Sequence, residues 1–366
     1  MWLIVNAGSS SLKLAVFDGD RVVAREAVAE IGTDGHALAL EVALRRSGVE
    51  LGRLTGAAHR VVHGGPLLTA TCRVTPKVLA GIEACVPLAP LHNPANLVGI
   101  QAVAGLLPGL PQYACFDTAF HATNPQVATS YALPLAERDR GLRRYGFHGT
   151  SYAALVRILA QRGDLPGRLL ACHLGNGASL CAIVNGRSVA TTMGYSPLDG
   201  LTMGTRSGAI DGNAVLRLVE EHGLDRAKVI LNRESGLLGL GGSSDLRGLH
   251  RADTPEARFA LAHFAYWAVR HAGSMVAAMG GLDAVVFTGG IGENDPWIRK
   301  EILSGLAFLG VSSNTDANAR NETALHDPSS RVAIWIVPAD EERQIALEAQ
   351  AVMEGKRHAV IAGEGA

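Results

Sequence analysis

The chain has 366 residues, of which 48% are hydrophobic and 18% are charged, and its formal net charge is −1 when the histidines are neutral. This length favours two domains, and this composition excludes an extended disordered chain. Because the charge is close to zero, neither nucleic acid nor an anionic membrane is expected as a partner.

The first residues do not have the pattern of a secretory signal. Residues 1–10 turn polar after a short apolar run and have no basic region, so we expect a cytoplasmic protein. The most apolar helical segment, 258–281, contains His263, Arg270 and His271, and therefore predicts a buried helix rather than a membrane span. Five cysteines without metal-ligand spacing predict reduced, mostly buried thiols.

In chain order, strands alternate with helices, which predicts an α/β protein. Apolar runs predict strands at 2–5, 12–18 and 21–26, a second hairpin of the same plan within 168–192, a buried strand in the segment that begins at 282, and a strand at 331–338. Helical spacing predicts helices at 151–161, 213–223, 296–310 and 340–354. A glycine turn is expected directly after the strand that ends at Thr288.

The first strands are repeated later in the chain. When "NAGSSSLKLAVFDGDR" is aligned without gaps to the segment from His173, Gly8 meets Gly175, Asp18 meets Asn185 and Gly19 meets Gly186. Any two hairpins with polar turns share some features, but duplicated domains are the better interpretation.

The glycine turns are candidate phosphate sites. A strand that ends in small residues exposes backbone N–H groups, which can surround a phosphate. A tight turn also needs glycine for purely conformational reasons, and Lys13 can equally point to solvent. Three such turns, at Gly8, at Gly175–Gly177 and at Gly289–Gly292, favour a nucleotide site that lacks the Walker spacing.

Nine blocks then occur in the order seen in acetate kinases, which the chain resembles from Asn6 to Glu342. They are "NAGSSSLK", "HRVVHGG", "PLAPLHNP", "CFDTAFH", "RYGFHGTS", "HLGNGAS", "TTMGYSPLDGLTMGTRSG", "FTGGIGEN" and "PADEE". The resemblance implies two duplicated ribonuclease H-like (actin-like ATPase) domains around a central cleft. We expect them at 1–121 with 341–366, and at 122–340.

The resemblance also implies an ATP-dependent kinase that phosphorylates acetate, with magnesium or manganese as the metal, in a homodimer. By position, Asn6 and Glu341 correspond to metal-binding residues, although Glu341 can also simply stabilise a helix start. Arg60 and Arg206 correspond to arginines that hold the acetate carboxylate and the transferring phosphoryl group. Guanidinium suits both anions because its planar fork matches their oxygens.

Other positions are assigned in the same way. His148 corresponds to a histidine that stabilises the transition state and Asp117 to a polar or proton-handling aspartate. The acetate methyl pocket corresponds to Val62, Leu91, Phe147 and Pro197, which without the resemblance would be interpreted as core. The predicted ATP-binding residues are Lys13, His173, Leu174, Gly175, Asn176, Gly177, Asp245, Leu246, Arg247, Gly290, Ile291, Gly292, Glu293 and Asn294.

The chain departs from the family pattern at Pro66, Ala209 and Gly212, which puts loop geometry and the dimer surface in doubt. A propionate or butyrate kinase is the alternative within the class. A nucleotide-dependent switch protein is the alternative outside it, because the fold alone does not fix the function.

Overall fold

The computed structural model describes residues 1–8, 11–32 and 35–356. The chain divides into two compact units. Unit 1 contains Met1–Ala122, Phe147–Ala154 and the C-terminal segment from Asp340, and unit 2 contains Thr123–Gly146 and Leu155–Ala339. The functional domain limits expected from the sequence stay a prediction.

Unit 1 is built on a six-stranded sheet of order β3-β2-β1-β4-β6-β5. The strands are β1 (Trp2–Ala7), β2 (Ser11–Asp18), β3 (Arg21–Ala29), β4 (Gly56–Val61), β5 (Cys72–Arg73) and β6 (Gln112–Phe116). The first three are antiparallel neighbours, whereas β4 runs parallel to both β1 and β6. The ends of β1 and β4 therefore lie at the same edge of the sheet.

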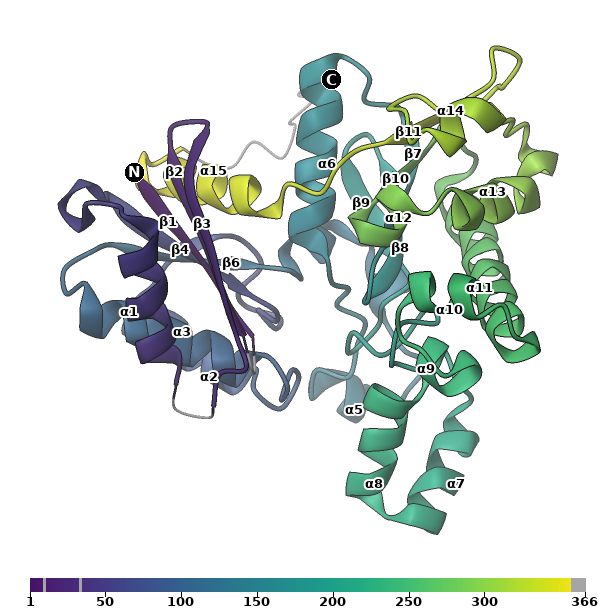
Figure 1. Ribbon diagram of the computed structural model, residues 1–366. Helices are drawn as coiled ribbons and strands as arrows, with labels where there is room; N and C mark the ends of the chain where they lie inside the picture. The colour runs from purple at the N-terminus through teal and green to yellow at the C-terminus, as the bar shows by residue number, and fades with distance from the viewer. Residues whose placement is uncertain (9–10, 33–34, 357–366) are drawn as a thin grey trace. The chain divides into compact units, whose positions relative to one another are not determined.

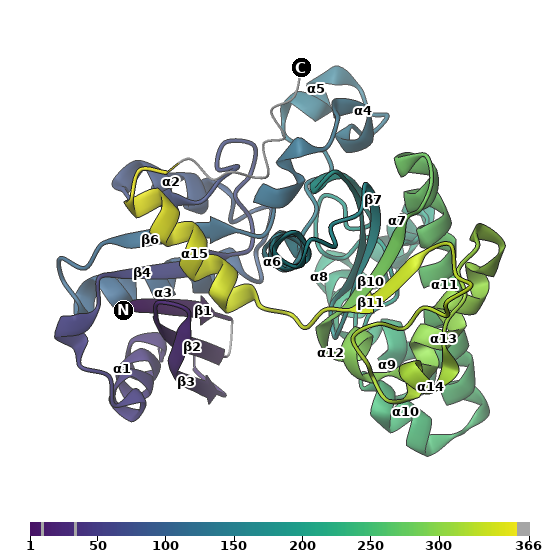
Figure 2. The same cartoon turned by 90° about the horizontal axis from the view of Figure 1, so that it is seen from above.

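Helices cover both faces of this sheet, as Figures 1 and 2 show. Apolar side chains of α1 (His36–Ser47) and α3 (Asn93–Leu106) pack with those of β1 and β2 on one face. On the other face, Ile345, Ala346 and Ala349 of α15 (Glu341–Met353) pack against Trp2 and Ile4. The remaining helix of this sheet layer is α2 (Pro76–Ala84). The alternation of strand side chains is thus used on both faces.

Unit 2 repeats the strand order of unit 1. Its sheet has the order β11-β10-β7-β8-β9. The strands are β7 (Arg168–Leu174), β8 (Ala178–Val184), β9 (Arg187–Thr191), β10 (Ala284–Thr288) and β11 (Ala333–Ile336). Again the first three are antiparallel and the next two parallel. Strand for strand, β7, β8, β9, β10 and β11 correspond to β1, β2, β3, β4 and β6, which confirms the predicted duplication.

The helices before and between these strands are mostly short. They are α4 (Gln126–Thr129), α5 (Leu135–Asp139), α6 (Gly149–Arg162), α7 (Gly212–His222), α8 (Leu224–Val229), α9 (Gly236–Gly241), α10 (Leu246–Ala252), α11 (Pro255–Met279), α12 (Gly289–Asn294), α13 (Pro296–Gly305) and α14 (Thr315–Ala319). The long α11 packs along β7, β8 and β9. No helix among the described residues is long and apolar enough to cross a membrane.

Two local predictions were wrong. The glycine turn after Thr288 is the helix α12, because Gly289 turns the chain with a φ of +80° and the Glu293 carboxylate accepts a hydrogen bond from its N–H. The helix predicted at 296–310 ends at Gly305. All five cysteines are free thiols and four of them are buried, as the sequence predicted.

Candidate active site

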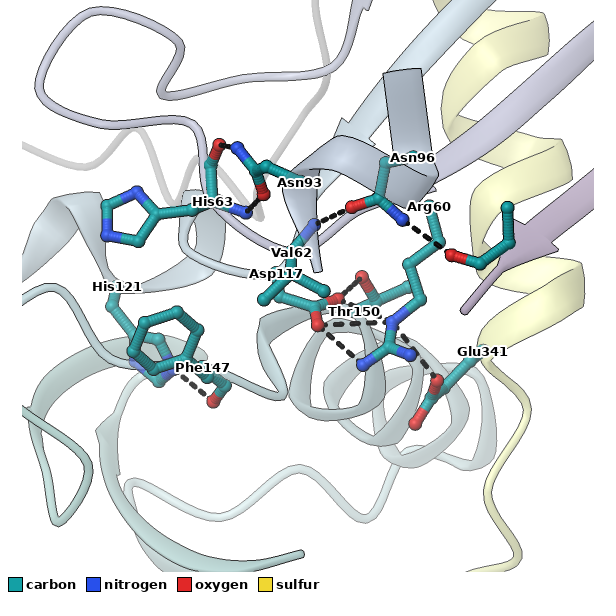
Figure 3. Close-up of polar contacts among 11 residues, drawn as sticks. Arg60, Val62, His63, Asn93, Asn96, Asp117, His121, Phe147, Thr150 and Glu341 are labelled. Carbon is teal, nitrogen blue, oxygen red and sulfur yellow. Dashed lines mark hydrogen bonds and ion pairs between the residues drawn. The ribbon is translucent and has the colours of Figure 1, made fainter. Parts of the chain in front are cut away.

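An arginine–aspartate pair lies at the end of two parallel strands of unit 1. Arg60 of β4 donates from Nε and Nη2 to both carboxylate oxygens of Asp117, at 2.6 to 3.1 Å (Figure 3). Asp117 follows β6 and is 1% exposed, whereas the Arg60 side chain is 22% exposed. Burial alone would lower the pKa of the guanidinium, but the charges of Asp117 and Glu341 outweigh it and raise that pKa. The pair fixes the guanidinium and leaves part of it open to solvent.

The segment around His148 is bound to the same aspartate. Thr150 donates its hydroxyl to Asp117 Oδ1 at 3.1 Å, and the Gly149 N–H donates to the Asp117 carbonyl at 2.9 Å. His148 itself has a φ of +60°, in the left-handed region that non-glycine residues rarely adopt. Such backbone strain clusters at functional sites, where surrounding contacts hold it in place.

Two buried asparagines hold the strand end that carries Arg60. Asn96 accepts from the Val62 N–H at 3.1 Å and donates to the Ala7 carbonyl at 2.8 Å, so it joins the ends of β4 and β1. Asn93 accepts from the His63 N–H at 3.1 Å and donates back to the His63 carbonyl at 3.0 Å. The amides therefore supply the hydrogen bonds that the backbone lacks beyond the sheet.

The predicted metal-binding residues both belong to unit 1. Glu341 is the first residue of α15, and its carboxylate lies 4.0 Å from Arg60 Nε (Figure 3). Asn6 lies near the end of β1, paired in register with Lys13, whose side chain is exposed. The turn between them includes Ser9 and Ser10, which lie outside the described residues.

Two of the four residues predicted to form the methyl pocket are buried side chains of unit 1. Val62 and Phe147 are buried, and the Phe147 ring contacts His63 with centroids 5.5 Å apart. Leu91 is instead 45% exposed, and Pro197 belongs to unit 2. His121 Nε2 lies 2.9 Å from the Phe147 carbonyl, and burial lowers the pKa of this histidine to about 4. His121 is therefore neutral near pH 7.

Arg206 of unit 2 has a different environment from Arg60. It donates from Nη1 to the Pro197 carbonyl at 2.6 Å, and burial lowers the pKa of its guanidinium to about 10. Within the described ranges, no ion pair joins Arg206 to a carboxylate. A half-buried cation without a counter-charge is a suitable group to receive an anionic ligand.

Unit 2 also contains a pocket of about 850 Å³. Its walls come from the turn after β7, the start of α10 and the region of α12 and α13. The residues that line it are Gly175, Asn176, Ser244, Asp245, Leu246, Arg247, His250, Gly290, Ile291, Asn294, Asp295, Pro296 and Trp297. Three segments far apart in sequence thus meet in one cavity of the size that small ligands occupy.

Eight of the predicted ATP-binding residues line this pocket, and the others do not. The eight are Gly175, Asn176, Asp245, Leu246, Arg247, Gly290, Ile291 and Asn294. Leu174 and Gly292 are buried in the elements behind it. Glu293 directs its carboxylate to the backbone, because Oε1 accepts from the N–H groups of Gly289 and Ala339, both at 2.9 Å. His173 and Gly177 lie in the adjoining hairpin and Lys13 lies in unit 1.

Sequence reasoning missed several residues at these sites. Thr150 belongs to the motif "RYGFHGTS", but no role was predicted for it. No role was predicted for His250, Asp295 or Trp297 either. Trp297 follows a proline at a helix start, where an aromatic side chain gives no functional signal on its own. Only the fold reveals that this position faces the same cavity as residues 175 and 245.

This chain is similar to known proteins over nearly its whole length. A model of the Acetokinase family matches residues 37–347. The acetate kinase of Rhodopseudomonas palustris is 41% identical over 97% of this chain and 99% of its own length. The crystal structure of Porphyromonas gingivalis acetate kinase is 35% identical, covers 96% of this chain and 99% of its own, and has a TM-score of 0.89. That of a propionate kinase from Francisella tularensis is 34% identical, covers 95% and 98%, and has a TM-score of 0.89.

Proposed function

Because the chain belongs to the acetokinase family, we propose that it transfers the γ-phosphoryl group of ATP reversibly to acetate, giving acetyl phosphate and ADP. The family consists of ATP-dependent carboxylate kinases, and the chain is an enzyme of that class. The observation that supports the proposal best is the presence of two arginines of opposite environment. One is paired with a buried aspartate, and the other has no carboxylate partner among the residues that the structure describes.

Arg60 is the proposed carboxylate ligand. Asp117 holds its Nε and Nη2 groups, so the guanidinium is oriented before any substrate binds. Preorganisation of this kind lowers the entropy that binding costs. Asp117 then acts by positioning Arg60, and the hydrogen bonds of Thr150 and of the Gly149 N–H attach the backbone that follows His148 to the same aspartate.

Arg206 and His148 are the proposed ligands of the transferring phosphoryl group. Phosphoryl transfer needs little covalent chemistry from the protein, because charge develops on the phosphoryl oxygens and positioned cations stabilise it. Direct in-line transfer from ATP to the acetate oxygen breaks the bond to the β-phosphate as the bond to acetate forms. No covalent enzyme intermediate is required.

A divalent cation, magnesium or manganese, fits the donors of Asn6 and Glu341. Magnesium is usually held by one or two protein oxygens together with phosphate oxygens and water. No cluster of three or more acidic, histidine or cysteine side chains suited to a metal lies among residues 1–8, 11–32 and 35–356. Because phosphate oxygens complete the coordination of magnesium at such sites, we expect the ion to bind together with the nucleotide, where it offsets phosphate charge.

Acetate is proposed as the preferred acceptor because Val62 and Phe147 are buried apolar neighbours of the Arg60 strand end. The solved propionate kinase of similar fold supports propionate as the second candidate. One methylene changes discrimination by only about 1–3 kcal/mol, so both acids should be measurable substrates.

An acyl-hydroxamate assay with ATP, magnesium and acetate, propionate or butyrate tests the proposal. We expect kcat/KM to fall in that order. A preference for butyrate would contradict the acetate assignment, and phosphorylation of none of them would favour a nucleotide-dependent switch. We also propose that the protein is a cytoplasmic homodimer. Light scattering would measure the mass of the dimer.

A further inference from the structure

The nucleotide pocket of unit 2 has one wall that the proposed ATP contacts do not use. Trp297 is the second residue of α13, lines the pocket and is 37% exposed. The flat face of an indole is a good surface for a planar ring.

The indole is held by a second ring from another helix. The ring centroids of His250, in α10, and Trp297 are 5.7 Å apart, and the planes are inclined by 74°. His250 also lines the pocket, so the edge-to-face contact lies along the cavity wall. Such a contact fixes the orientation of one ring relative to the other.

Asp295 connects these two residues. Its Oδ2 lies 2.9 Å from His250 Nε2, and its Oδ1 accepts from the Ile298 N–H at 3.0 Å, which caps α13. One carboxylate therefore holds both the helix start that carries Trp297 and the histidine that contacts its ring. The Asp295 side chain is 13% exposed and that of His250 is 34% exposed, so the carboxylate is mostly buried while the imidazole reaches solvent.

The opposite part of the pocket has a different character. The turn Gly175–Gly177 has two glycines and no bulky side chain, so its backbone can be approached closely by a phosphate more readily than by a base. Among the residues that line the pocket, only His250 and Trp297 have aromatic rings. A nucleotide has one polyanionic end and one planar aromatic end, and the cavity offers a matching surface for each.

We propose that the purine base of the nucleotide stacks on the Trp297 indole, and that His250, bound to Asp295, positions that indole. The proposal rests on the proposed function for the identity of the nucleotide. Trp297 is the residue that contacts the ligand, whereas His250 and Asp295 act through it.

Replacement of the indole tests the contact. Trp297→Ala should raise the KM for ATP on the order of 10-fold while kcat and the KM for acetate change less than about 3-fold, because base stacking on an aromatic side chain contributes only to binding. Trp297→Phe keeps a ring and should retain most of the affinity. Trp267→Phe is the matched control, since Trp267 lies in α11 and does not line this pocket.

Tryptophan fluorescence gives a readout independent of turnover. ADP should quench the emission of the wild type and of Trp267→Phe, and the quench should be lost in Trp297→Phe. An unchanged quench in Trp297→Phe, or an unchanged KM for ATP in Trp297→Ala, would overturn the proposal.

A double-mutant cycle tests the positioning role of His250. His250→Ala should weaken ADP binding on the order of 3-fold in the wild type and have no effect in Trp297→Ala, because its effect passes through the indole. Equal losses in both backgrounds would exclude that role.

Calorimetry of ADP binding separates the stacking proposal from the proposed function. If no carboxylate is phosphorylated but ADP affinity still depends on Trp297, the acetate kinase assignment fails and the stacking site stands.

Discussion

Arg206 differs from the other arginines of the site in having no carboxylate partner in the described parts of the chain. If it stabilises the transferring phosphoryl group, Arg206→Ala should lower kcat on the order of 10³-fold and change the dissociation constant of ADP little. Steady-state kinetics and calorimetry measure the two effects. Arg217→Ala is the control, because that side chain is 70% exposed on α7. A kcat similar to that of the control would remove Arg206 from the mechanism.

Arg60 is expected to affect both binding and stability. Arg60→Ala should raise the KM for acetate, and it leaves Asp117 buried with Thr150 as its remaining side-chain partner. Breaking a fully buried pair costs about 3–5 kcal/mol, and the partial exposure of Arg60 reduces our expectation to roughly 2 kcal/mol. Urea denaturation measures this loss. Arg53→Ala, at an exposed ion pair, should be nearly neutral. Equal stability of the two variants would mean that the burial of Asp117 without Arg60 costs no stability.

At the scale of single residues, the sequence motifs named candidate residues but did not indicate which of them are in contact. Arg60 and Asp117 were predicted separately, from two motifs, and their bidentate pairing was not. Thr150, His250 and Asp295 were missed, because a hydrogen bond between residues 33 or 45 positions apart leaves no local pattern. Their partners are set by the meeting of strand ends and helix starts, which only the fold determines.

Among the elements, strands and long helices followed the apolar period, whereas glycine-rich connections did not. The run Gly289–Asn294 has poor helix propensity. Glu293 holds it as α12, because its carboxylate accepts from the N–H of Gly289 at the helix start and from that of the distant Ala339. Gly305 is the reverse case. A Cβ there would lie 2.6 Å from Val269, so glycine allows α13 to approach α11 closely. Propensity alone cannot distinguish these two uses of glycine.

Two buried histidines should make stability depend on pH. Burial lowers the pKa of His59, in β4, and of His121 to about 4, below the ordinary value of 6.5. Between pH 6.5 and 4 the unfolded chain binds protons that the folded chain does not, so stability falls as the pH falls. Each histidine contributes a slope of up to about 1.4 kcal/mol per pH unit.

Urea denaturation between pH 4 and 7 measures that slope. His59→Gln should reduce the slope by up to about 1.4 kcal/mol per pH unit, the contribution of one proton, because the variant has no titrating group at that position. His222→Gln is the control, since His222 is exposed at the end of α7. If both variants kept the wild-type slope, His59 would have to titrate normally in the folded protein.

For the whole molecule, duplication has produced two sheets of the same order with different surroundings. Unit 1 holds the Arg60–Asp117 pair and Glu341, whereas the 850 Å³ pocket is lined entirely by unit 2. The repeated hairpin predicted this duplication from the sequence, because strand order follows from hairpins and parallel connections. It could not predict the pocket of unit 2, since that depends on the insertions between strands.

The residues proposed for the metal belong to unit 1, whereas those that line the proposed nucleotide pocket belong to unit 2. Glu341→Ala should leave the affinity for ADP unchanged when magnesium is absent, because every residue lining the pocket remains. When magnesium is present, the gain in affinity and the apparent magnesium affinity in the kinase assay should both be smaller than in the wild type. The fold should persist, since a carboxylate at a helix start contributes only about 1 kcal/mol.

Thermal denaturation with ADP, with and without magnesium, measures these effects, because a ligand at 100 times its Kd stabilises the folded state by about 2.7 kcal/mol. Glu342→Ala is the control: the neighbouring carboxylate occupies the same helix turn but pairs with Arg25. Equal magnesium responses in the two variants would return Glu341 to a helix-stabilising role. A loss of ADP binding in Glu341→Ala without magnesium would instead show that nucleotide affinity depends on unit 1, contrary to a pocket whose lining belongs to unit 2 alone.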